Sequence, residues 1–318
     1  MSAKPDVRVR SGPAGNGRTQ RSTVARVGGV ELTLTNLDKE LYPGYGFTKA
    51  RLLDYYRRIS RSILPHLRDR ALTLKRFPDG TGGPFFFEKR CPPARPGWVP
   101  IASVPRIGGE STTACLVNDL RTLIWVENLA SIELHVPLAR ARSSHTPDAV
   151  VFDLDPGDGA GIADCCRVAL IIREMLVRLR VSCWAKTSGM KGLHVLVPLN
   201  REGVTFERAR DFSKAVALLV QRNHPELVTT LLAKPERTGK VFINWAQNSS
   251  TKTMVAVYSL RAREAPVVSF PATWSEVEDG ADGRAKLTIL HSDALRRVEK
   301  SGDLFSEVLA RRQTLPIL

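Results

Sequence analysis

Two aspartates separated by one residue, Asp153 and Asp155, are the pair in this chain best suited to chemistry. They close the apolar run 149–155, which predicts a β-strand. Because side chains alternate along a strand, both carboxylates lie on one face, while Phe152 and Leu154 lie on the other. At a rise of ~3.3 Å per residue the two Cα atoms are about 6.6 Å apart. Carboxylates at this spacing can hold two divalent cations ~3.5–4 Å apart.

A solvent-exposed turn is the alternative interpretation, because Pro156 and Gly157 directly follow the pair and D-x-D patterns are common. An EF-hand is excluded, since its loop would need Asp or Asn at position 157 and glycine at position 158. The pair stands at the carboxyl end of its strand, which is where open α/β sheets bind ligands. This position favours a site.

A glycine-containing turn, residues 187–194 (TSGMKGLH), carries groups that bind phosphate. Its glycines let backbone N–H groups turn toward an anion, Lys191 adds a positive charge, and Ser188 adds a hydroxyl donor. The alternative is a hairpin turn with an incidental lysine, and the turn is not a P-loop because no G-K-[ST] opens a helix. The acidic pair and this turn fall in one predicted β-α-β-β unit. Metal ions beside a phosphate-binding turn are what nucleotidyl transfer requires.

The elements that must position these residues follow from hydrophobic periodicity. In the second half we predict strands at 149–155, 181–187, 193–198, 240–245 and 253–260, and helices at 162–179 and 205–222. In the first half we predict a strand at 30–34, a helix at 48–67, an irregular segment at 77–97, and a strand, a helix and a strand within 116–136. Thr48 is the expected N-cap of the helix at 48–67, and the helix within 116–136 is expected to begin near Asp119. The fold class is α/β or α+β with mixed sheets.

Charge is the informative feature of the composition. The 318 residues include 47 Lys and Arg against 32 Asp and Glu, a net charge of +15 that favours nucleic acid as the partner. The first 28 residues hold six basic residues and one acidic residue, and we interpret them as a disordered basic tail. The length suggests one large domain or two lobes. No apolar run resembles a membrane span or a signal peptide, and five cysteines without a C-x-x-C pair are interpreted as reduced cytosolic thiols.

Several further motifs carry a family resemblance. They are residues 35–39 with 42–43 and 48–49, 75–80, 86–89, 133–137, 153–157, 188–194, 240–248 and 258–261. From about residue 30 to the C-terminus the chain resembles the polymerase domain of bacterial DNA ligase D, a branch of the archaeo-eukaryotic primase superfamily. The resemblance implies a primase-like fold over 29–318, with an N-terminal α/β module packed on an RRM-like catalytic module at roughly 149–262.

The resemblance also implies site residues. Asp153 and Asp155, with position 244, would form the catalytic set and hold two Mn²⁺ or Mg²⁺ ions for attack of a primer 3′-hydroxyl on the nucleotide α-phosphate. His135 would lie beside the sugar, with ribonucleotides favoured. The implied nucleotide-binding residues are Ser188, Lys191, His194, His135, Arg261, Lys75 and Gln247. The implied DNA-binding residues are Lys39 and Lys49 at a 5′-phosphate, Phe86 and Phe87 on bases, and Arg76 and Arg237. From the residues alone, the phenylalanines would be assigned to the core and the two lysines to the surface.

Position 244 departs from the family pattern, because Asn244 stands where the third metal-binding Asp is expected. An amide keeps the shape of a carboxylate but loses its charge and is a weaker ligand for a hard cation. Three interpretations stay open: an engineered change, a natural change in a chain with weak or no synthesis, or replacement by another acid. We expect nucleotide binding to survive, one metal ion to be weakened and polymerisation to be impaired.

The implied function is a DNA-dependent DNA/RNA polymerase that fills gaps and extends ends in bacterial non-homologous end joining. The expected partners are double-stranded DNA ends with a 5′-phosphate, gapped DNA, NTP or dNTP, a Ku-like end-binding protein and a DNA ligase, with no membrane. The expected location is the cytoplasm, at the bacterial nucleoid. Two alternatives are a catalytically weak or inactive module that binds DNA ends and nucleotides, and a metal-dependent nuclease. The nuclease would explain the acids but not the 188–194 turn or Arg261.

Overall fold

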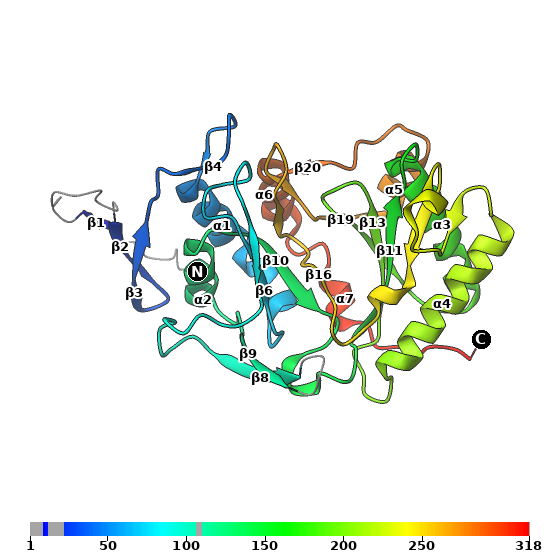
Figure 1. Ribbon diagram of the computed structural model, residues 1–318, viewed down its shortest axis with the longest axis horizontal. Coiled ribbons are helices and arrows are strands. Elements are labelled where there is room, and N and C mark those ends of the chain that lie inside the picture. Colours follow the sequence, from blue (N-terminus) through cyan, green and yellow to red (C-terminus); the bar gives the residue numbers. More distant parts are fainter. Residues whose placement is uncertain (1–8, 12–21, 106–109, 318) are drawn as a thin grey trace.

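Two modules lie side by side in the computed structural model, which describes residues 9–11, 22–105 and 110–317. The N-terminal module is built on a four-stranded sheet of order β16-β10-β6-β7, and the C-terminal module on a six-stranded sheet (Figure 1). The strands of the first sheet are β6 (Thr73–Arg76), β7 (Phe86–Glu88), β10 (Ser131–Pro137) and β16 (Thr253–Val255). Because β16 follows all but one strand of the C-terminal sheet in sequence, the chain returns to complete the N-terminal sheet.

One face of the N-terminal sheet packs on α1 (Lys49–Leu67) and α2 (Leu120–Asn128). Both helices begin at the expected residues, since the Thr48 and Asp119 side chains accept hydrogen bonds from backbone N–H groups of the first turn. Leu74 and Leu134 on this face join the core, and alternation leaves the neighbouring residues of each strand on the opposite face. That second face is the one turned toward the candidate site.

The C-terminal sheet has the order β14-β15-β11-β13-β12-β19. Its strands are β11 (Ala149–Pro156), β12 (Trp184–Thr187), β13 (Leu193–Pro198), β14 (Val228–Thr229), β15 (Val241–Asn244) and β19 (Pro271–Ala272). One face is covered by α3 (Ile162–Arg178), α4 (Phe206–Asn223) and α5 (Trp274–Ala281). The central order β15-β11-β13-β12, with α3 after β11 and α4 after β13, is the β-α-β-β-α-β arrangement. The predicted RRM-like topology is therefore confirmed.

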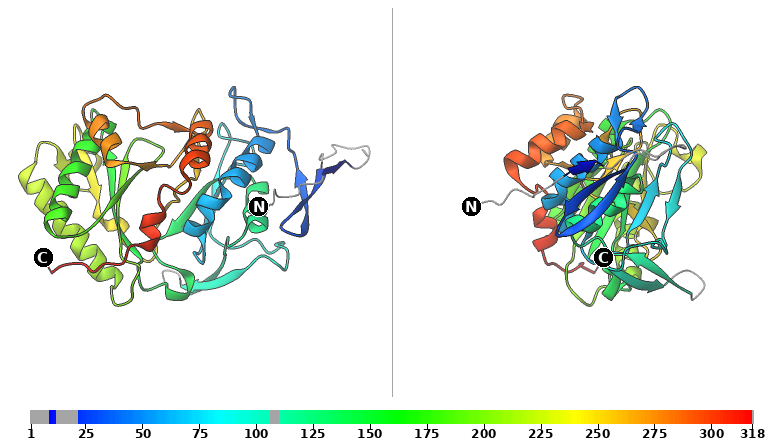
Figure 2. Two further views of the ribbon diagram at one scale, coloured as in Figure 1. Left: turned by 180° about the vertical axis from the view of Figure 1, so that it is seen from behind. Right: turned by 90° about the vertical axis from the view of Figure 1, so that its left-hand side faces the viewer.

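Helices near the C-terminus connect the modules. From behind, α6 (His291–Ser301) and α7 (Ser306–Ala310) lie between α1 and the C-terminal sheet (Figure 2). The smaller elements are β4 (Glu40–Tyr42) with β5 (Phe47–Thr48), β8 (Ile101–Pro105) with β9 (Ser111–Cys115), and β17 (Leu260–Arg261) with β18 (Val267–Val268) and β20 (Ile289–Leu290). None of the helices in the described ranges combines the length and apolar composition that a bilayer crossing requires.

The prediction of a disordered tail is wrong for residues 9–11 and 22–28. Ser22–Val27 form β2, which pairs with β3 (Val30–Thr35), and Val9–Ser11 form β1. Gly28 and Gly29 both have positive φ and make the two-residue turn of this hairpin. Its apolar side chains pack on α1 and α2 because every second residue of β2 faces inward. Residues 1–8 and 12–21, which the same prediction covered, lie outside the described residues.

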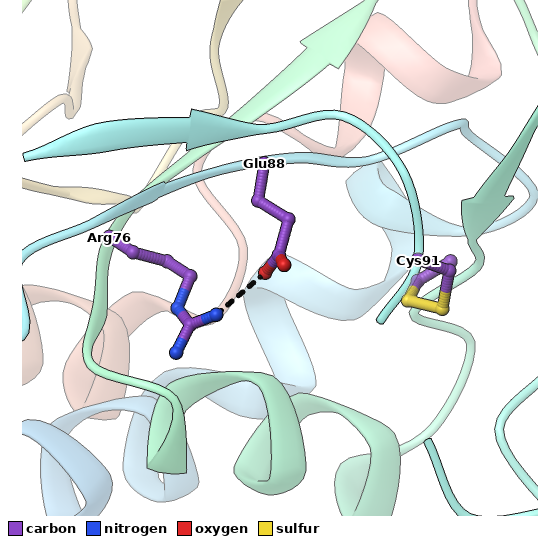
Figure 3. The surroundings of a disulfide bond; sticks show 4 residues. Arg76, Glu88 and Cys91 are labelled. Carbon is purple, nitrogen blue, oxygen red and sulfur yellow. Dashed lines mark hydrogen bonds and ion pairs between the residues drawn. A yellow bond between two sulfur atoms is a disulfide. The ribbon is translucent and has the colours of Figure 1, made fainter. Parts of the chain in front are cut away.

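The prediction of five reduced thiols is also wrong. Cys91 and Cys115 form a disulfide with their Cα atoms 4.8 Å apart, whereas Cys165, Cys166 and Cys183 are buried free thiols. The backbone N–H of Cys91 donates to Thr113 in β9 at 2.7 Å, which brings two cysteines 24 residues apart in sequence into contact. Figure 3 shows the disulfide close to the Arg76–Glu88 ion pair of β6 and β7.

Other predicted elements are present with shifted ends. The strand expected at 253–260 is interrupted, because β16 ends at Val255 and Tyr258 has a φ of +67°. The strand expected near residue 116 ends at Cys115, the strand expected from 181 begins at Trp184, and the irregular segment 77–97 contains β7. Helices α5, α6 and α7 were not predicted, since the first two are short and α7 spans barely more than one turn.

A buried carboxyl in α2 gives the first testable prediction. Glu127 is fully buried, and neither carboxylate oxygen has a hydrogen-bond partner within the described residues. Burial raises its pKa well above the ordinary value. A carboxyl whose folded-state pKa is raised holds a proton that the unfolded chain releases, so the free energy of unfolding falls as pH rises above ~4.5. Glu127→Gln should therefore stabilise the protein at pH 8 by on the order of 1–3 kcal/mol.

Thermal unfolding between pH 5 and pH 9 measures this effect. A gain of 1 kcal/mol corresponds to roughly 2–4 °C in a protein of this size. The gain should grow with pH in Glu127→Gln and be absent in Glu226→Gln, which changes an exposed acid. A lower melting temperature for Glu127→Gln across this range would contradict the prediction.

Candidate active site

A row of polar side chains, His194, Asp153 and Asn244, crosses three neighbouring strands. Asp153 in the central strand β11 is directly opposite both His194 in β13 and Asn244 in β15. Asn244 Nδ2–H donates to Asp153 Oδ2 at 3.1 Å, and His194 Nε2 lies 3.2 Å from Asp153 Oδ1. Asp155 is two residues farther along β11, so its side chain is on the same face. This face is turned toward the N-terminal module, since Val151 on it belongs to the core shared with α1.

The two aspartates have different electrostatic surroundings. Burial alone would raise the pKa of Asp153, but the contact with His194 and the hydrogen bond from Asn244 outweigh it and hold the pKa below its ordinary value. Burial, and next the charge of Asp153, raise the pKa of Asp155 to about 6. Burial, followed by the charge of Lys186, lowers the pKa of His194 to about 4, so this imidazole is neutral at pH 7. Asp153 and Asp155 thus form a pair of carboxylates in which a bound cation would stabilise the charged form of Asp155.

The donor atoms of this row fit a divalent metal ion. Asn244 Oδ1 is buried and finds no hydrogen-bond partner in the described part of the chain. Together with the Asp153 and Asp155 carboxylates it forms a set of oxygen ligands of the kind that Mg²⁺ and Mn²⁺ prefer. Across residues 9–11, 22–105 and 110–317, no group of three or more Asp, Glu, His or Cys could hold a metal ion.

The turn between β12 and β13 is held by its own serine. Ser188 Oγ accepts hydrogen bonds from the backbone N–H groups of Met190 and Gly192, both at 3.1 Å. A hydroxyl that accepts two hydrogen bonds still has its own hydrogen to donate. Gly189 has a φ of +69°, and a Cβ at Gly192 would lie 2.0 Å from the Leu154 carbonyl oxygen. Both glycines are therefore required for the turn to lie against the acidic strand.

A second cluster lies on the open face of the N-terminal sheet around Glu133 in β10. His135 Nε2 is 2.8 Å from Glu133 Oε2, and Lys75 Nζ is 3.5 Å from Oε1. Arg261 Nε approaches Oε2 at 3.4 Å, while Arg261 Nη1–H donates to the Ser188 carbonyl at 3.1 Å. Three of the predicted nucleotide-binding residues are thus brought together, and Arg261 connects them to the turn.

The phenylalanines beside this cluster are at the surface rather than in the core. Phe86 is 44% exposed and Phe87 is 51% exposed. Lys75 Nζ lies 5.7 Å from the Phe87 ring centroid, and the Arg76 guanidinium lies 5.1 Å from that of Phe86. The Phe87 and His135 rings are 5.8 Å apart between centroids. Exposed aromatic rings next to cations form a surface on which nucleic-acid bases can stack.

The predicted end-binding lysines lie near each other. Lys49 is only 4% exposed, and its Nζ donates to Thr35 Oγ1 at 3.2 Å. Burial, followed by the charges of Lys39 and Arg76, lowers the pKa of Lys49 to about 8. Lys39 also forms an ion pair with Asp79 at 2.6 Å. Because Lys39 and Arg76 repel the charge of the partly buried Lys49, an anion bound beside Lys49 would stabilise that charge.

Three predicted residues lie apart from these clusters. Arg237 stacks over Phe242 at 3.7 Å and lowers the pKa of Asp155, so it lies on the metal side of the site rather than with Lys39 and Lys49. Gln247 Nε2–H donates to the Thr253 carbonyl at 2.9 Å. Lys191 is exposed on the turn.

Sequence reasoning missed two buried residues, Glu133 and Lys186. Lys186 in β12 is directly opposite His194, and its Nζ–H donates to Ser269 Oγ at 2.7 Å. Burial, and next the charge of Arg261, lower its pKa well below the ordinary value. Both residues are two positions from a predicted site residue on the same strand or its turn, His135 and Ser188 respectively. Period-two alternation places them on the same face as those residues, but it does not show that this face is buried.

The chain is similar to proteins of bacterial end joining. A family model described as LigD, primase-polymerase domain matches residues 48–305. The multifunctional non-homologous end joining protein LigD of Mycolicibacterium smegmatis is 39% identical over 276 residues, which cover 86% of this chain and 35% of the relative. The bifunctional non-homologous end joining protein LigD of Bacillus subtilis is 30% identical over 287 residues, covering 90% and 46%. This chain therefore spans less than half the length of either relative.

A solved structure shows the same fold. The polymerase domain of Mycobacterium tuberculosis ligase D, in complex with DNA, superposes with a TM-score of 0.82 at 37% sequence identity, covering 89% of this chain and 99% of that one. Fold and site together define a primase-like nucleotidyltransferase. The chain belongs to the LigD primase-polymerase family. Polymerases of this family are metal-dependent.

Proposed function

We propose that this chain is a template-dependent polymerase that fills gaps and extends broken ends in bacterial non-homologous end joining. One observation carries the proposal: the Asp153–Asp155 strand end and the Ser188 turn belong to one sheet, and Arg261 links that turn to Glu133 and His135 beside the exposed Phe87 ring. A nuclease would need the acids but has no use for a phosphate-binding turn linked to Arg261. The DNA in the M. tuberculosis complex supports a nucleic-acid substrate.

Two Mn²⁺ or Mg²⁺ ions would be held by Asp153 and Asp155, one of them weakened by Asn244. When bound, such ions activate a primer 3′-hydroxyl and neutralise charge on the phosphates during in-line attack on the α-phosphate. Asn244 Nδ2 and His194 Nε2 orient the Asp153 carboxylate, with distances to its oxygens of 3.1 and 3.2 Å. The weaker amide ligand is the reason to expect impaired polymerisation, and it is the observation that favours a catalytically weak binding module as the second candidate function.

The nucleotide would lie between the two clusters. Ser188, Lys191, His194 and Arg261 would bind its triphosphate. His135 and Lys75 would lie at its sugar and base, next to Phe87, with ribonucleotides favoured and Gln247 nearby. Lys75, His135 and Arg261 contact Glu133, and Arg261 also contacts Ser188. His194 contacts Asp153 in a second group. Two polar groups of this kind suit a charged ligand with a polar sugar.

The DNA would contact the outer part of the N-terminal module. Phe86 and Phe87 would stack on bases, Arg76 would bind the backbone, and Lys39 with Lys49 would bind the 5′-phosphate of the break. Arg237, beside Asp155, would contact DNA at the metal side of the site. A DNA end is a polyanion, and the net charge of +15 adds long-range attraction to these contacts.

Nucleotide incorporation on a gapped, 5′-phosphorylated duplex tests the proposal. With labelled nucleotide and Mn²⁺, a polymerase lengthens the primer, a binding module shifts the duplex unchanged, and a nuclease shortens a strand. The expected result is slow, template-matched extension. A shortened strand, or binding without any extension at saturating Mn²⁺, would overturn the polymerase assignment.

Lys49 gives a prediction for end recognition. A lysine paired with a phosphate contributes about 1.5–3 kcal/mol, so Lys49→Gln should reduce the preference for 5′-phosphate over 5′-hydroxyl ends by on the order of 10–100-fold. Because the pKa of Lys49 is about 8, the wild-type preference should be full at pH 6.5 and should decline above pH 8 as the ammonium loses its proton. The preference of Lys49→Gln should not change with pH over this range.

Equilibrium binding of matched duplexes, with and without the phosphate, measures this preference. Lys300→Gln is the control, since it removes the same charge from an exposed position on α6. If Lys49→Gln weakened both duplexes equally, the lysine would be a nonspecific contact and the assignment would be wrong.

The whole-protein context is also a proposal. A Ku-like end-binding protein and a DNA ligase would be the partners, acting at the nucleoid in the cytoplasm. The domain, predicted over residues 29–318 with its catalytic part at roughly 149–262, would also include β2 (Ser22–Val27), which pairs with β3 and packs on α1 and α2. The basic residues before it would add nonspecific DNA affinity. The family model, which matches residues 48–305, supports a single domain of this extent.

A further inference from the structure

Glu133 contacts three of the proposed nucleotide-binding side chains, Lys75, His135 and Arg261, and has no role in the proposed function. Its side chain is 1% exposed and accepts the Ala262 backbone N–H at 3.1 Å, besides contacting Lys75, His135 and Arg261. All its contacts are with donors of the protein, and its negative charge would repel a triphosphate. Glu133 is therefore placed to act on the nucleotide through other residues.

These contacts cross from one module to the other. Glu133 and His135 are on β10 of the N-terminal sheet. Arg261 is in β17, which follows β16 in sequence, and its guanidinium donates to the carbonyl of Ser188 in the C-terminal module. The path His135–Glu133–Arg261–Ser188 consequently runs from the proposed sugar end of the pocket to its proposed phosphate end. Moving one carboxylate would change both ends together.

The charge of Glu133 is fixed. Burial alone would raise its pKa, but the hydrogen bond with His135 and the charges of Arg261, His135 and Lys75 lower it to about 2. Burial lowers the pKa of His135. A neutral imidazole that donates Nε2–H to a carboxylate has an unprotonated Nδ1, which is a hydrogen-bond acceptor. This acceptor can bind a sugar hydroxyl. The Glu133 carboxylate determines that Nδ1, rather than Nε2, is the accepting nitrogen of His135.

We propose that Glu133 is the positioning residue of the nucleotide pocket, which orients the His135 ring and the Arg261 guanidinium so that both meet one bound nucleoside triphosphate. The inference rests on the proposed function, because it assigns a nucleotide to this pocket. A group that holds ligand-binding side chains in one orientation typically contributes about 10–100-fold to the affinity for the ligand, because those side chains would otherwise adopt other orientations.

A double-mutant cycle in nucleotide binding tests the proposal. The probe is a non-hydrolysable ribonucleoside triphosphate with Mn²⁺, titrated into the full chain without DNA. Glu133→Gln should weaken binding by about 10–100-fold. In an Arg261→Gln background the same change should weaken binding by a clearly smaller factor, because only the contact with His135 is then left to lose. Affinity for a 5′-phosphorylated duplex should stay within about 2-fold of wild type, since Glu133 contacts none of the lysines proposed to bind the end.

Two further variants keep the result interpretable. Glu127→Gln removes a buried carboxyl from the same module and should leave nucleotide affinity unchanged. Glu133→Asp keeps the negative charge on a side chain that is shorter by one methylene. This variant should fold, and its affinity for the nucleotide should lie between those of wild type and Glu133→Gln. Equal losses from Glu133→Gln in both backgrounds, or wild-type affinity in both Glu133 variants, would overturn the positioning role. Failure of the wild-type chain to bind the triphosphate would instead overturn the proposed function and this inference with it.

Discussion

Asn244→Asp should increase primer extension with Mn²⁺ by on the order of 10–100-fold, which corresponds to about 1.4–2.7 kcal/mol of barrier. The substitution adds a third carboxylate directly opposite Asp153, where the amide oxygen of Asn244 already lies buried without a hydrogen-bond partner in the described ranges. A carboxylate there is a stronger ligand for a hard cation and adds negative charge to neutralise it. Nucleotide affinity should change far less than the rate of extension, because Arg261 and Ser188 are unaltered.

Without a metal ion, Asn244→Asp should lower the stability of the protein. Asn244 Nδ2–H donates to Asp153 Oδ2 at 3.1 Å, and an aspartate would replace this hydrogen bond with repulsion between carboxylates. In EDTA, Asn244→Asp should melt below wild type, and Mn²⁺ should raise its melting temperature more than it raises that of wild type. With that result, Asn244 is interpreted as a residue that stabilises the metal-free site and weakens metal binding.

Single-turnover extension at several Mn²⁺ concentrations, together with thermal unfolding, measures both effects. Asn223→Asp, at an exposed position of α4, controls for the change of charge alone. Equal extension rates for wild type and Asn244→Asp at all Mn²⁺ concentrations would refute the idea that position 244 limits catalysis.

The parts of this site that could be predicted from sequence are those that depend on residues close to one another in the chain. The helix at 48–67, the strand pair around 149–155 and 193–198, and the turn at 187–194 follow from local periodicity and turn chemistry, and the structure contains all of them. The contact between Asp153 and Asn244 depends on strand register across 91 residues, which composition does not encode. The family resemblance, rather than the local pattern, marked position 244 as unusual.

The remaining misses have a common physical cause. The Cys91–Cys115 disulfide depends on how β9 folds back along the segment after β7, and no spacing rule applies to cysteines that meet in this way. Glu133 and Lys186 are charged residues on strands, and isolated charges on a strand are ordinarily assigned to its solvent side. Only the second module reveals that this side is buried. The residues hardest to predict are accordingly those between the two sheets.

Asp155→Asn should reduce extension by more than about 1,000-fold, or roughly 4 kcal/mol, because it removes one of the two carboxylates that would hold the metal ions. Since the pKa of Asp155 is about 6, protons compete with the cation at this group. At limiting Mn²⁺ the wild-type rate should therefore fall as pH decreases through about 6, and higher Mn²⁺ should move this midpoint to lower pH.

The stability of Asp155→Asn should change in the opposite direction. Because the folded-state pKa of Asp155 is raised, the native protein holds a proton that the unfolded chain releases, and stability is lost as pH rises from about 4 to about 6. In EDTA at pH 7.5, Asp155→Asn should be more stable than wild type by on the order of 1–3 kcal/mol. Asp158→Asn, which changes an exposed acid three residues away, should alter neither property. An Asp155→Asn protein that extended primers normally, or melted below wild type without metal, would show that this carboxylate is structural and that the metal ions bind elsewhere.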